Sequence, residues 1–249
     1  PRSKDELYQL ADTFNRMLER IQTGLEQQKR FAADASHELR TPITVIGGYA
    51  DMLDRWGKND PVTLNEGISA IKSETQNMHN LIEKLLYLAR MDSGAIHLQR
   101  DEFDTKPLLE ELAKETKLIA PEHTIILGDN PAALILADAQ SIKQMLRIFL
   151  ENALKYTPRK GTITISAVKE LNWLRIHIKD TGIGIAPQDQ NKIFDRFYRV
   201  DKSRSKDTGG AGLGLAIAQW ITRMHSGRIE LESELNVGTT IIVSLPLLK

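Results

Sequence analysis

The 249-residue sequence contains no cysteine, which excludes disulfide bonds, thiolate zinc sites, iron–sulfur clusters and cysteine nucleophiles. It also has no net charge, because 33 Lys and Arg residues balance 33 Asp and Glu residues. No overall electric field therefore draws the chain to nucleic acid or to anionic lipid. We expect no nucleic-acid partner, and any site for a polyanion has to be built locally.

Long apolar runs are absent as well. No segment reaches the roughly 18 residues that a membrane span needs, and the opening PRSK does not lead into a signal-peptide core. The chain starts at Pro1, without methionine and directly before a helical pattern, so we expect a soluble piece of a longer protein. An apolar fraction of 41% with 27% charged residues is ordinary for a folded chain, and the length predicts two or more units.

The first third of the sequence has the periodicity of helices. Apolar residues recur at steps of three and four over residues 7–53 and again over 68–89, which predicts two long helices separated by the breakers in 57–61. This pattern favours an antiparallel hairpin. Two helices bury too little surface to stand alone, so we expect two hairpins to form a homodimeric four-helix bundle. The alternative is packing against the rest of the same chain.

After Gly94 the pattern changes to an α+β type, for which three helices on one face of a mixed sheet would account. The expected strands are 96–103, 123–127, 133–136, 161–168, 173–179, 227–233 and 239–245, and the expected helices are 107–119, 139–156, 187–194 and 213–225. Residues 199–212 are rich in Gly, Ser, Asp and Lys and are predicted to form a long mobile loop.

The segment FAADASHELRTP, residues 31–42, lies in the first predicted helix. His37 falls between two seam positions and must point outward, with Thr41 and Thr44 on the same face. A neutral imidazole can act as a nucleophile if a neighbour holds the proton on its other nitrogen. Pro42 should kink the helix one turn later. A histidine beside a glutamate is otherwise an ordinary solvated surface residue.

Three further sequence motifs suggest a nucleotide site. In ENALKY (151–156), Asn152 and Lys155 share a helix face; an amide oxygen suits Mg²⁺ and an ammonium suits phosphate, although a lysine also simply complements a helix end. In DTGIGI (180–185), the carboxylate of Asp180 can accept a hydrogen bond from the amine of adenine, and the glycines permit a tight turn. Such a turn is more often structural when it stands alone.

The third string, GGAGLGL (209–215), opens a helix whose amides can hold phosphate oxygens. It lacks the ending of a Walker loop and the surroundings of a dinucleotide-binding turn. The preceding IFDRFYRVD (193–201) begins a stretch crowded with charges of both signs. That stretch is either a solvated loop or a lid that closes on ATP, and the adjacent phosphate site favours the lid.

Residues 31–42 resemble the H box of the dimerisation domain of two-component sensor histidine kinases. The strings above, with NVGTT (236–240), resemble the N, F and three Gly-rich boxes of the ATP-binding domain of that family. The resemblance covers residues 31–249 and implies a multidomain protein: a long-helix hairpin forming a dimeric four-helix bundle, followed by an α+β sandwich of the GHKL or Bergerat ATPase fold. Residues 4–21 also resemble the second helix of a HAMP signal relay, although Tyr8 stands where a glycine is usual. The expected domains are therefore the C-terminal helix of a HAMP relay at 1–24, the dimerisation and phosphotransfer hairpin at 25–94 and the catalytic domain at 95–249.

In the first of these boxes the resemblance implies that His37 accepts the phosphoryl group, that Glu38 takes or holds a proton from its ring, and that Thr41 positions water for a phosphatase reaction. In the catalytic domain the resemblance implies that Asn152 ligates Mg²⁺ and that the other box residues bind ATP. Those residues are Lys155, Tyr156, Asp180, Gly182, Gly184, Arg196, Arg199, Gly210, Gly212, Leu213, Gly214 and Thr239, with Phe194 and Phe197 anchoring the lid.

One position departs from the family. Ile148 stands one turn before Asn152, where many members carry a second Asn and where related ATPases carry a catalytic Glu. Isoleucine can neither bind metal nor act as a base, which argues against the alternative of a hydrolytic ATPase clamp. The intact boxes argue against a second alternative, a catalytically silent dimeric scaffold.

The resemblance also implies partners. It implies a homodimer, the receiver domain of a response regulator as the phosphoryl acceptor, and attachment to the cell membrane through segments before Pro1, with this piece on the cytoplasmic side.

Overall fold

The computed structural model describes residues 6–57, 60–200 and 210–248. Its contacts divide the chain into two compact units, the first ending at Leu85 and the second running from Leu86. The domain limits at 24 and 94 remain predictions.

The first unit is helical, as expected. Helix α1 (Glu6–Met52) continues past Pro42 into a π-helical turn, η1 (Leu53–Gly57), and α2 (Pro61–Asp92) follows. The last residues of α2, from Leu86, belong to the second unit. The start of α2 is set by Asp60, whose carboxylate accepts hydrogen bonds from the Val62 amide (3.0 Å) and from the Thr63 hydroxyl (2.6 Å). These bonds satisfy the first turn of the helix and lower the pKa of Asp60.

The second unit is built on a mixed five-stranded sheet in the order β2-β4-β5-β7-β6. Only β2 and β4 pair in parallel; the other neighbours are antiparallel. The strands are β2 (Thr124–Leu127), β4 (Thr162–Glu170), β5 (Trp173–Asp180), β6 (Arg228–Glu234) and β7 (Gly238–Pro246). A separate two-stranded sheet pairs β1 (Asp101–Asp104) with β3 (Leu134–Ala137).

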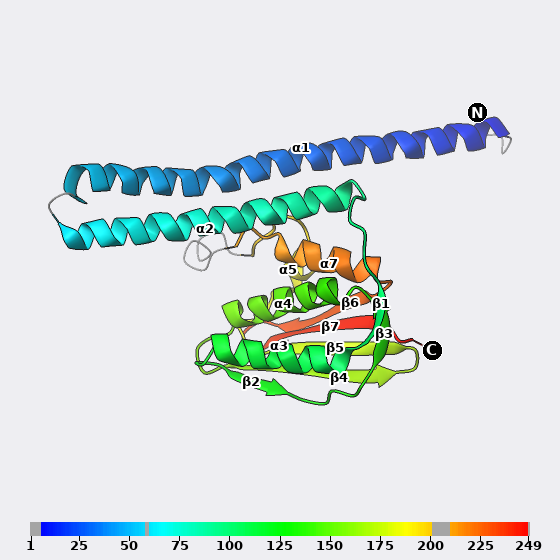
Figure 1. Ribbon diagram of the computed structural model, residues 1–249. Helices are drawn as coiled ribbons and strands as arrows, with labels where there is room; N and C mark the ends of the chain where they lie inside the picture. Colours follow the sequence, from blue (N-terminus) through cyan, green and yellow to red (C-terminus); the bar gives the residue numbers. More distant parts are fainter. Residues whose placement is uncertain (1–5, 58–59, 201–209, 249) are drawn as a thin grey trace. The chain divides into compact units, whose positions relative to one another are not determined.

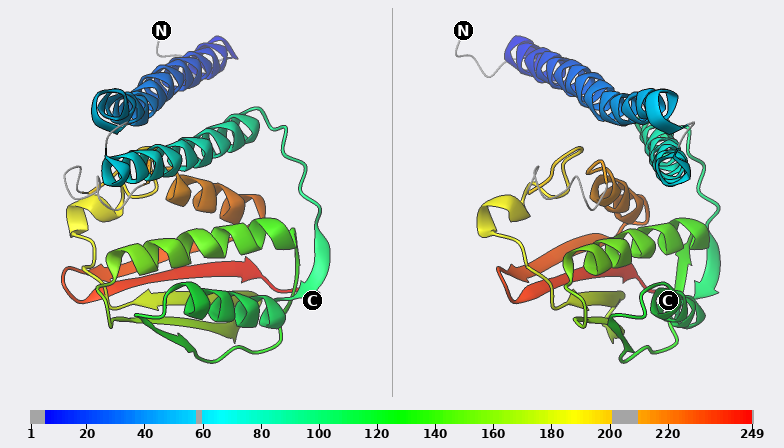
Figure 2. Two further views of the ribbon diagram at one scale, coloured as in Figure 1. Left: turned by 60° about the vertical axis from the view of Figure 1, so that its left-hand side comes forward. Right: turned by 90° about the vertical axis from the view of Figure 1, so that its left-hand side faces the viewer.

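Three helices cover one face of this sheet (Figures 1 and 2), as the sequence predicts. They are α3 (Thr105–Ile119), α4 (Ala139–Tyr156) and α7 (Gly214–Met224). Alternate residues of β4 and β5, such as Ile165 and Ile176, are fully buried, and so are Phe149 of α4 and Ile217 of α7. This period-two burial on one face of the sheet is the core of the second unit.

Two expected elements are shorter than predicted. The strand expected at 96–103 pairs only from Asp101, because its partner β3 ends at Ala137 and the next residue, Asp138, caps α4 instead. The amide of Gln99 accordingly bonds the Asp138 side chain (2.9 Å) rather than a strand. The helix expected at 187–194 is the single turn α5 (Pro187–Gln190), followed by hydrogen-bonded turns.

Candidate functional site

The carboxylate of Asp180 lies at the end of β5 and is only 8% exposed. Its Oδ1 accepts hydrogen bonds from the amides of Gly182 (2.8 Å) and Thr239 (3.3 Å). Burial raises the pKa of Asp180 and the two amide bonds oppose that rise. Among the described residues none donates to Oδ2, so one oxygen is held by the protein while the other can accept a bond from a ligand.

Two glycines shape the turn after Asp180. A Cβ on Gly182 would lie 2.5 Å from the Tyr156 carbonyl oxygen and 2.7 Å from Asp180 Oδ1. Gly184 has a φ of 65°, and its Cβ would lie 1.9 Å from the Glu234 carbonyl oxygen. Both positions therefore require glycine for steric reasons. Their part in the site is to let the backbone approach closely.

Gly238 has the same function and was not among the predicted site residues. Its φ is 142°, and a Cβ there would lie 2.1 Å from the Asp180 carbonyl oxygen. Strand register places Thr239 opposite Asp180, so this glycine permits the approach that brings the Thr239 amide to the carboxylate. The signal for it in the sequence is that it is the glycine of NVGTT (236–240), the third Gly-rich box.

The C-terminal end of α4 brings together the predicted base and phosphate contacts. Lys155 Nζ lies 5.2 Å from the centre of the Tyr156 ring, and a Cβ on Gly210 would lie 3.2 Å from the same nitrogen. Tyr156 is 45% exposed. Burial of the phenol raises the pKa of Tyr156, and the positive charge of Arg199 lowers it. Lys155, Tyr156, Arg199 and Gly210 thus form one cluster.

Asn152 lies one turn before this cluster and is half-buried. Ile148, 9% exposed, packs against the first residue of α7: its Cγ2 would lie 3.1 Å from a Cβ on Gly214. The apolar side chain at this position therefore supports the glycine that begins α7. The described residues contain no group of three or more His, Asp or Glu side chains that could hold a metal ion by themselves. One amide oxygen is nevertheless compatible with Mg²⁺, which usually takes one or two protein ligands and completes its shell with phosphate and water.

The two ends of the predicted lid are joined, although residues 201–209 lie outside the described part of the chain. The Phe197 amide donates to the Gly212 carbonyl (3.0 Å). Gly212 has a φ of 69°, and its Cβ would lie 2.7 Å from the Tyr198 carbonyl oxygen. Leu213 is buried directly before α7. These contacts place the base of the lid beside the N-terminus of α7.

Arg196, which was expected to bind ATP, forms an ion pair with a carboxylate. Its Nη1 and Nη2 donate to the two carboxylate oxygens of Asp92, at the end of α2, over 2.7 Å and 2.6 Å. This bidentate pair raises the pKa of Arg196. The nucleotide contact expected of Arg196 stays a prediction.

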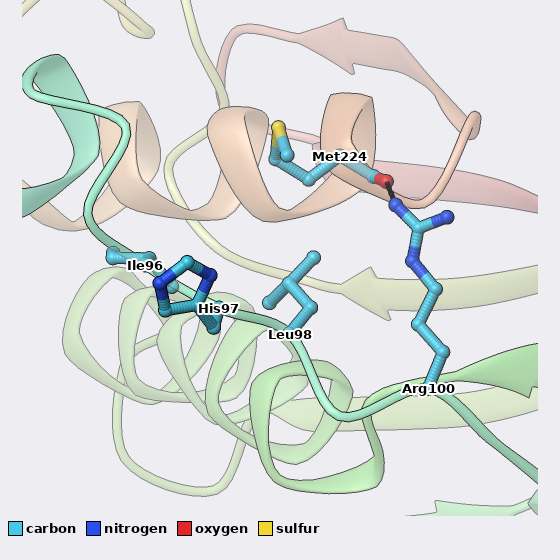
Figure 3. Close-up of a pocket in the computed structure, with 5 residues that line it drawn as sticks. All are labelled: Ile96, His97, Leu98, Arg100 and Met224. Atoms are coloured by element: carbon cyan, nitrogen blue, oxygen red, sulfur yellow. Dashed lines mark hydrogen bonds between the residues drawn. The ribbon is translucent and has the colours of Figure 1, made fainter.

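The hollow drawn in Figure 3 lies elsewhere in the second unit. It is lined by Ile96, His97, Leu98, Arg100 and Met224, none of them a predicted site residue. Arg100 Nη2 donates to the Met224 carbonyl over 2.5 Å. This bond satisfies a carbonyl at the end of α7, so the side chain has a structural role there.

The helix that carries His37 belongs to the first unit. His37 and Thr41 are both exposed on α1, and the Thr41 hydroxyl lies 3.5 Å from the His37 carbonyl oxygen. Glu38 is half-buried. The outward placement of His37 that the helical periodicity predicts is therefore found. No helix in the described part of the chain is both long enough and apolar enough to span a bilayer.

Known proteins share both halves of the chain. Residues 27–94 match the His Kinase A (phospho-acceptor) domain, and residues 137–249 match the family of histidine kinase-, DNA gyrase B- and HSP90-like ATPases. The histidine-protein kinase ArlS of Staphylococcus epidermidis (strain ATCC 12228) is 38% identical over 246 residues, which cover 98% of this chain and 54% of the relative. The chain thus spans about half the length of that curated relative.

Solved structures agree. The Acinetobacter baumannii histidine kinase AdeS shares the fold with a TM-score of 0.66 at 24% identity, over 86% of this chain and 98% of that one. Full-length ShkA, in complex with AMPPNP, gives a TM-score of 0.64 at 25% identity, over 88% of this chain and 46% of that one. With both domain matches and the 38% identical relative, the chain belongs to the sensor histidine kinases.

Proposed function

We propose that the chain transfers the γ-phosphoryl group of ATP to His37, and then to an aspartate of a response-regulator receiver domain. The observation that carries this proposal is the buried Asp180 carboxylate, with one oxygen held by two backbone amides. A carboxylate accepts a hydrogen bond from the exocyclic amine of adenine, whereas guanine presents a carbonyl there and would be repelled. The ring of Tyr156 offers an apolar face for the same base.

At the other end of the site, the triphosphate would meet Lys155, the lid glycines Gly210 and Gly212, and the N-terminus of α7, where backbone amides favour anions. Asn152 would hold Mg²⁺, which when bound neutralises charge on the phosphate oxygens. The ShkA structure in complex with AMPPNP supports a nucleotide in this fold.

The transfer needs a neutral imidazole. One ring nitrogen of His37 attacks the γ-phosphorus, so that an N–P bond forms while the O–P bond to ADP breaks. Glu38 holds the proton of the other ring nitrogen and stabilises the charge that develops there. The phosphoryl group then passes to a carboxylate of the regulator. A hydrolytic clamp would need a carboxylate at position 148, where a buried isoleucine stands.

We further propose a homodimer that belongs to a membrane-bound kinase, with this piece on the cytoplasmic side and attached through segments before Pro1. Apolar side chains on α1 remain exposed in the single chain, for example Phe14 at 52%, and a second hairpin would cover them. The curated relatives are nearly twice as long as the matched region, which leaves room for a sensor and an anchor.

Incubation with γ-labelled ATP and Mg²⁺ tests the proposed reaction. We expect label on the protein that is lost in acid and retained in alkali, because a phosphoramidate bond has that stability and a phosphate ester does not. Label that survives acid would contradict a histidine acceptor, and labelled phosphate in solution without labelled protein would favour a plain ATPase.

The phosphatase reaction is tested at Thr41. Its hydroxyl lies one turn beyond His37 on the same face and could orient water toward a phospho-aspartate of the docked regulator. Thr41→Ala should leave folding and autophosphorylation intact, because alanine is the better helix former at this exposed site. We expect the decay of purified phospho-regulator in the presence of ADP to slow about tenfold. Equal rates for Thr41→Ala and the parent would contradict this role, and Thr44→Ala serves as the control on the same face.

A further inference from the structure

The segment 157–161 connects Tyr156, the last residue of α4, to Thr162, the first residue of β4. The two residues that flank it are tied to the Asp180 turn: the Ile183 amide donates to the Tyr156 carbonyl (3.2 Å), and the Thr162 amide donates to the Thr181 hydroxyl (2.9 Å). The Thr181 amide returns a bond to the Thr162 carbonyl (3.1 Å). The position of Tyr156 relative to Asp180 therefore depends on how this segment is held.

The segment itself is tied to residues 122–124, which lead into β2 and belong to none of the motifs. Two of these ties join backbone groups: Lys160 N to the Glu122 carbonyl (2.8 Å), and Thr124 N to the Gly161 carbonyl (2.9 Å). Two more ties involve side chains: an exposed ion pair between Glu122 and Arg159, and a hydrogen bond of His123. The His123 ring lies with Nε2 3.1 Å from the carbonyl oxygen of Thr157, the residue directly after Tyr156.

The Thr157 carbonyl determines which ring nitrogen of His123 carries the hydrogen. A carbonyl oxygen only accepts, so Nε2 carries the hydrogen and donates it. Nδ1 is buried and finds no partner among the described residues, and the same holds for the Thr157 hydroxyl. The useful contact of the ring is therefore the one from Nε2. A glutamine could place an N–H at a similar reach, whereas the shorter asparagine could not.

We infer that His123 is a positioning residue for the adenine subsite. By holding the Thr157 carbonyl, it fixes the first residue after α4 and with it the position of Tyr156 against the Asp180 turn. Lys155 is held within α4 by the hydrogen bonds of the helix itself, and the lid lies in another part of the chain. Loss of the His123 bond should thus weaken binding of the base and leave binding of the phosphates unchanged. The inference rests on the nucleotide site proposed above.

The test compares ligands with and without the base. Calorimetry would measure ADP, adenosine and inorganic tripolyphosphate with the parent, His123→Asn, His123→Gln and His123→Ala. We expect His123→Asn and His123→Ala to weaken the binding of ADP and adenosine about fivefold to tenfold, the scale of one hydrogen bond. The affinity for tripolyphosphate should stay within about twofold of the parent, and His123→Gln should bind all three ligands like the parent. In autophosphorylation, His123→Asn should raise the KM for ATP and leave kcat unchanged.

Two further variants separate the possible failures. Glu122→Ala is the matched control, because within the described part of the chain its side chain contributes an exposed ion pair with Arg159 of the same segment (2.9 Å) and no further ion pair or hydrogen bond. It should bind ADP like the parent. If Asp180→Ala binds ADP normally, the proposed site itself is wrong. The role of His123 is wrong in two cases, provided that Asp180→Ala loses ADP binding: if His123→Asn and His123→Gln bind ADP equally, or if His123→Asn weakens tripolyphosphate binding as much as ADP binding. The comparison of His123→Asn with His123→Gln decides this even if His123→Ala does not fold.

Discussion

Replacing His37 by alanine is expected to abolish phosphorylation of the protein while leaving ADP binding within about twofold of the parent. The side chain is exposed on α1 in the first unit, and every proposed nucleotide contact belongs to the second. Alanine is well suited to a helix, so folding should be preserved. The loss should be complete, because no other group replaces the nucleophile in the proposed reaction.

The measurement is incorporation of label from γ-labelled ATP, alongside calorimetric ADP binding on the same preparations. His79→Ala is the matched control, since it removes another exposed histidine, from α2; it should be labelled like the parent. Label on His37→Ala with the same acid lability would mean that another histidine is the acceptor. Loss of label together with loss of ADP binding would point to misfolding and would contradict the separation of the two roles.

Replacing Asp180 by alanine is expected to weaken ADP binding about tenfold to a hundredfold. A hydrogen bond to a charged acceptor contributes roughly 1.5–3 kcal/mol, and the buried carboxylate is the group we assign to the adenine amine. The effect should be specific for the base, so that inorganic tripolyphosphate binds Asp180→Ala nearly as well as the parent. Equal affinity of ADP for both proteins would contradict the proposed adenine subsite.

Asp180→Asn separates the functional from the structural contribution of this residue. Burial raises the pKa of Asp180 in the folded state, so folding disfavours the ionised form, and above that pKa the charge costs stability. As pH falls through the raised pKa toward the ordinary value, the carboxyl group is protonated and the cost disappears. The amide keeps an oxygen for the Gly182 and Thr239 amides. Without nucleotide we therefore expect Asp180→Asn to melt above the parent at pH 7, with a difference that shrinks in acid, while ADP binding is lost.

A thermal scan between pH 7 and pH 4 checks this, with the parent run in parallel. A melting temperature for Asp180→Asn that lies below the parent at pH 7 would show that the carboxylate stabilises the free protein. Retention of ADP affinity in this variant would contradict the need for two accepting oxygens.

Local signals in the sequence were sufficient for much of the fold. The steps of three and four predict α1 and α2, and the breakers at 57–61 predict where they end, because helix periodicity and capping depend on neighbours within a few residues. Helix α4 begins after Asp138, whose side chain caps its first turn, and ends at Tyr156, as the sequence predicts. Where pairing decided the outcome, prediction was less accurate: the strand expected at 96–103 shortened to four residues, because its length is set by β3, a segment thirty residues away.

The sequence by itself determined that this chain carries an outward-facing histidine on a long helix. It also determined the presence of the glycine- and asparagine-containing motifs of a nucleotide-binding domain, because each of these motifs is contiguous in the chain. Only the tertiary structure decided which distant groups meet. Strand register brings the Thr239 amide to Asp180. Helix packing places Ile148 against Gly214, and Arg196 forms an ion pair with Asp92. The contact of His123 with Thr157 is of the same kind. These contacts join residues far apart in the chain, and no local pattern encodes them.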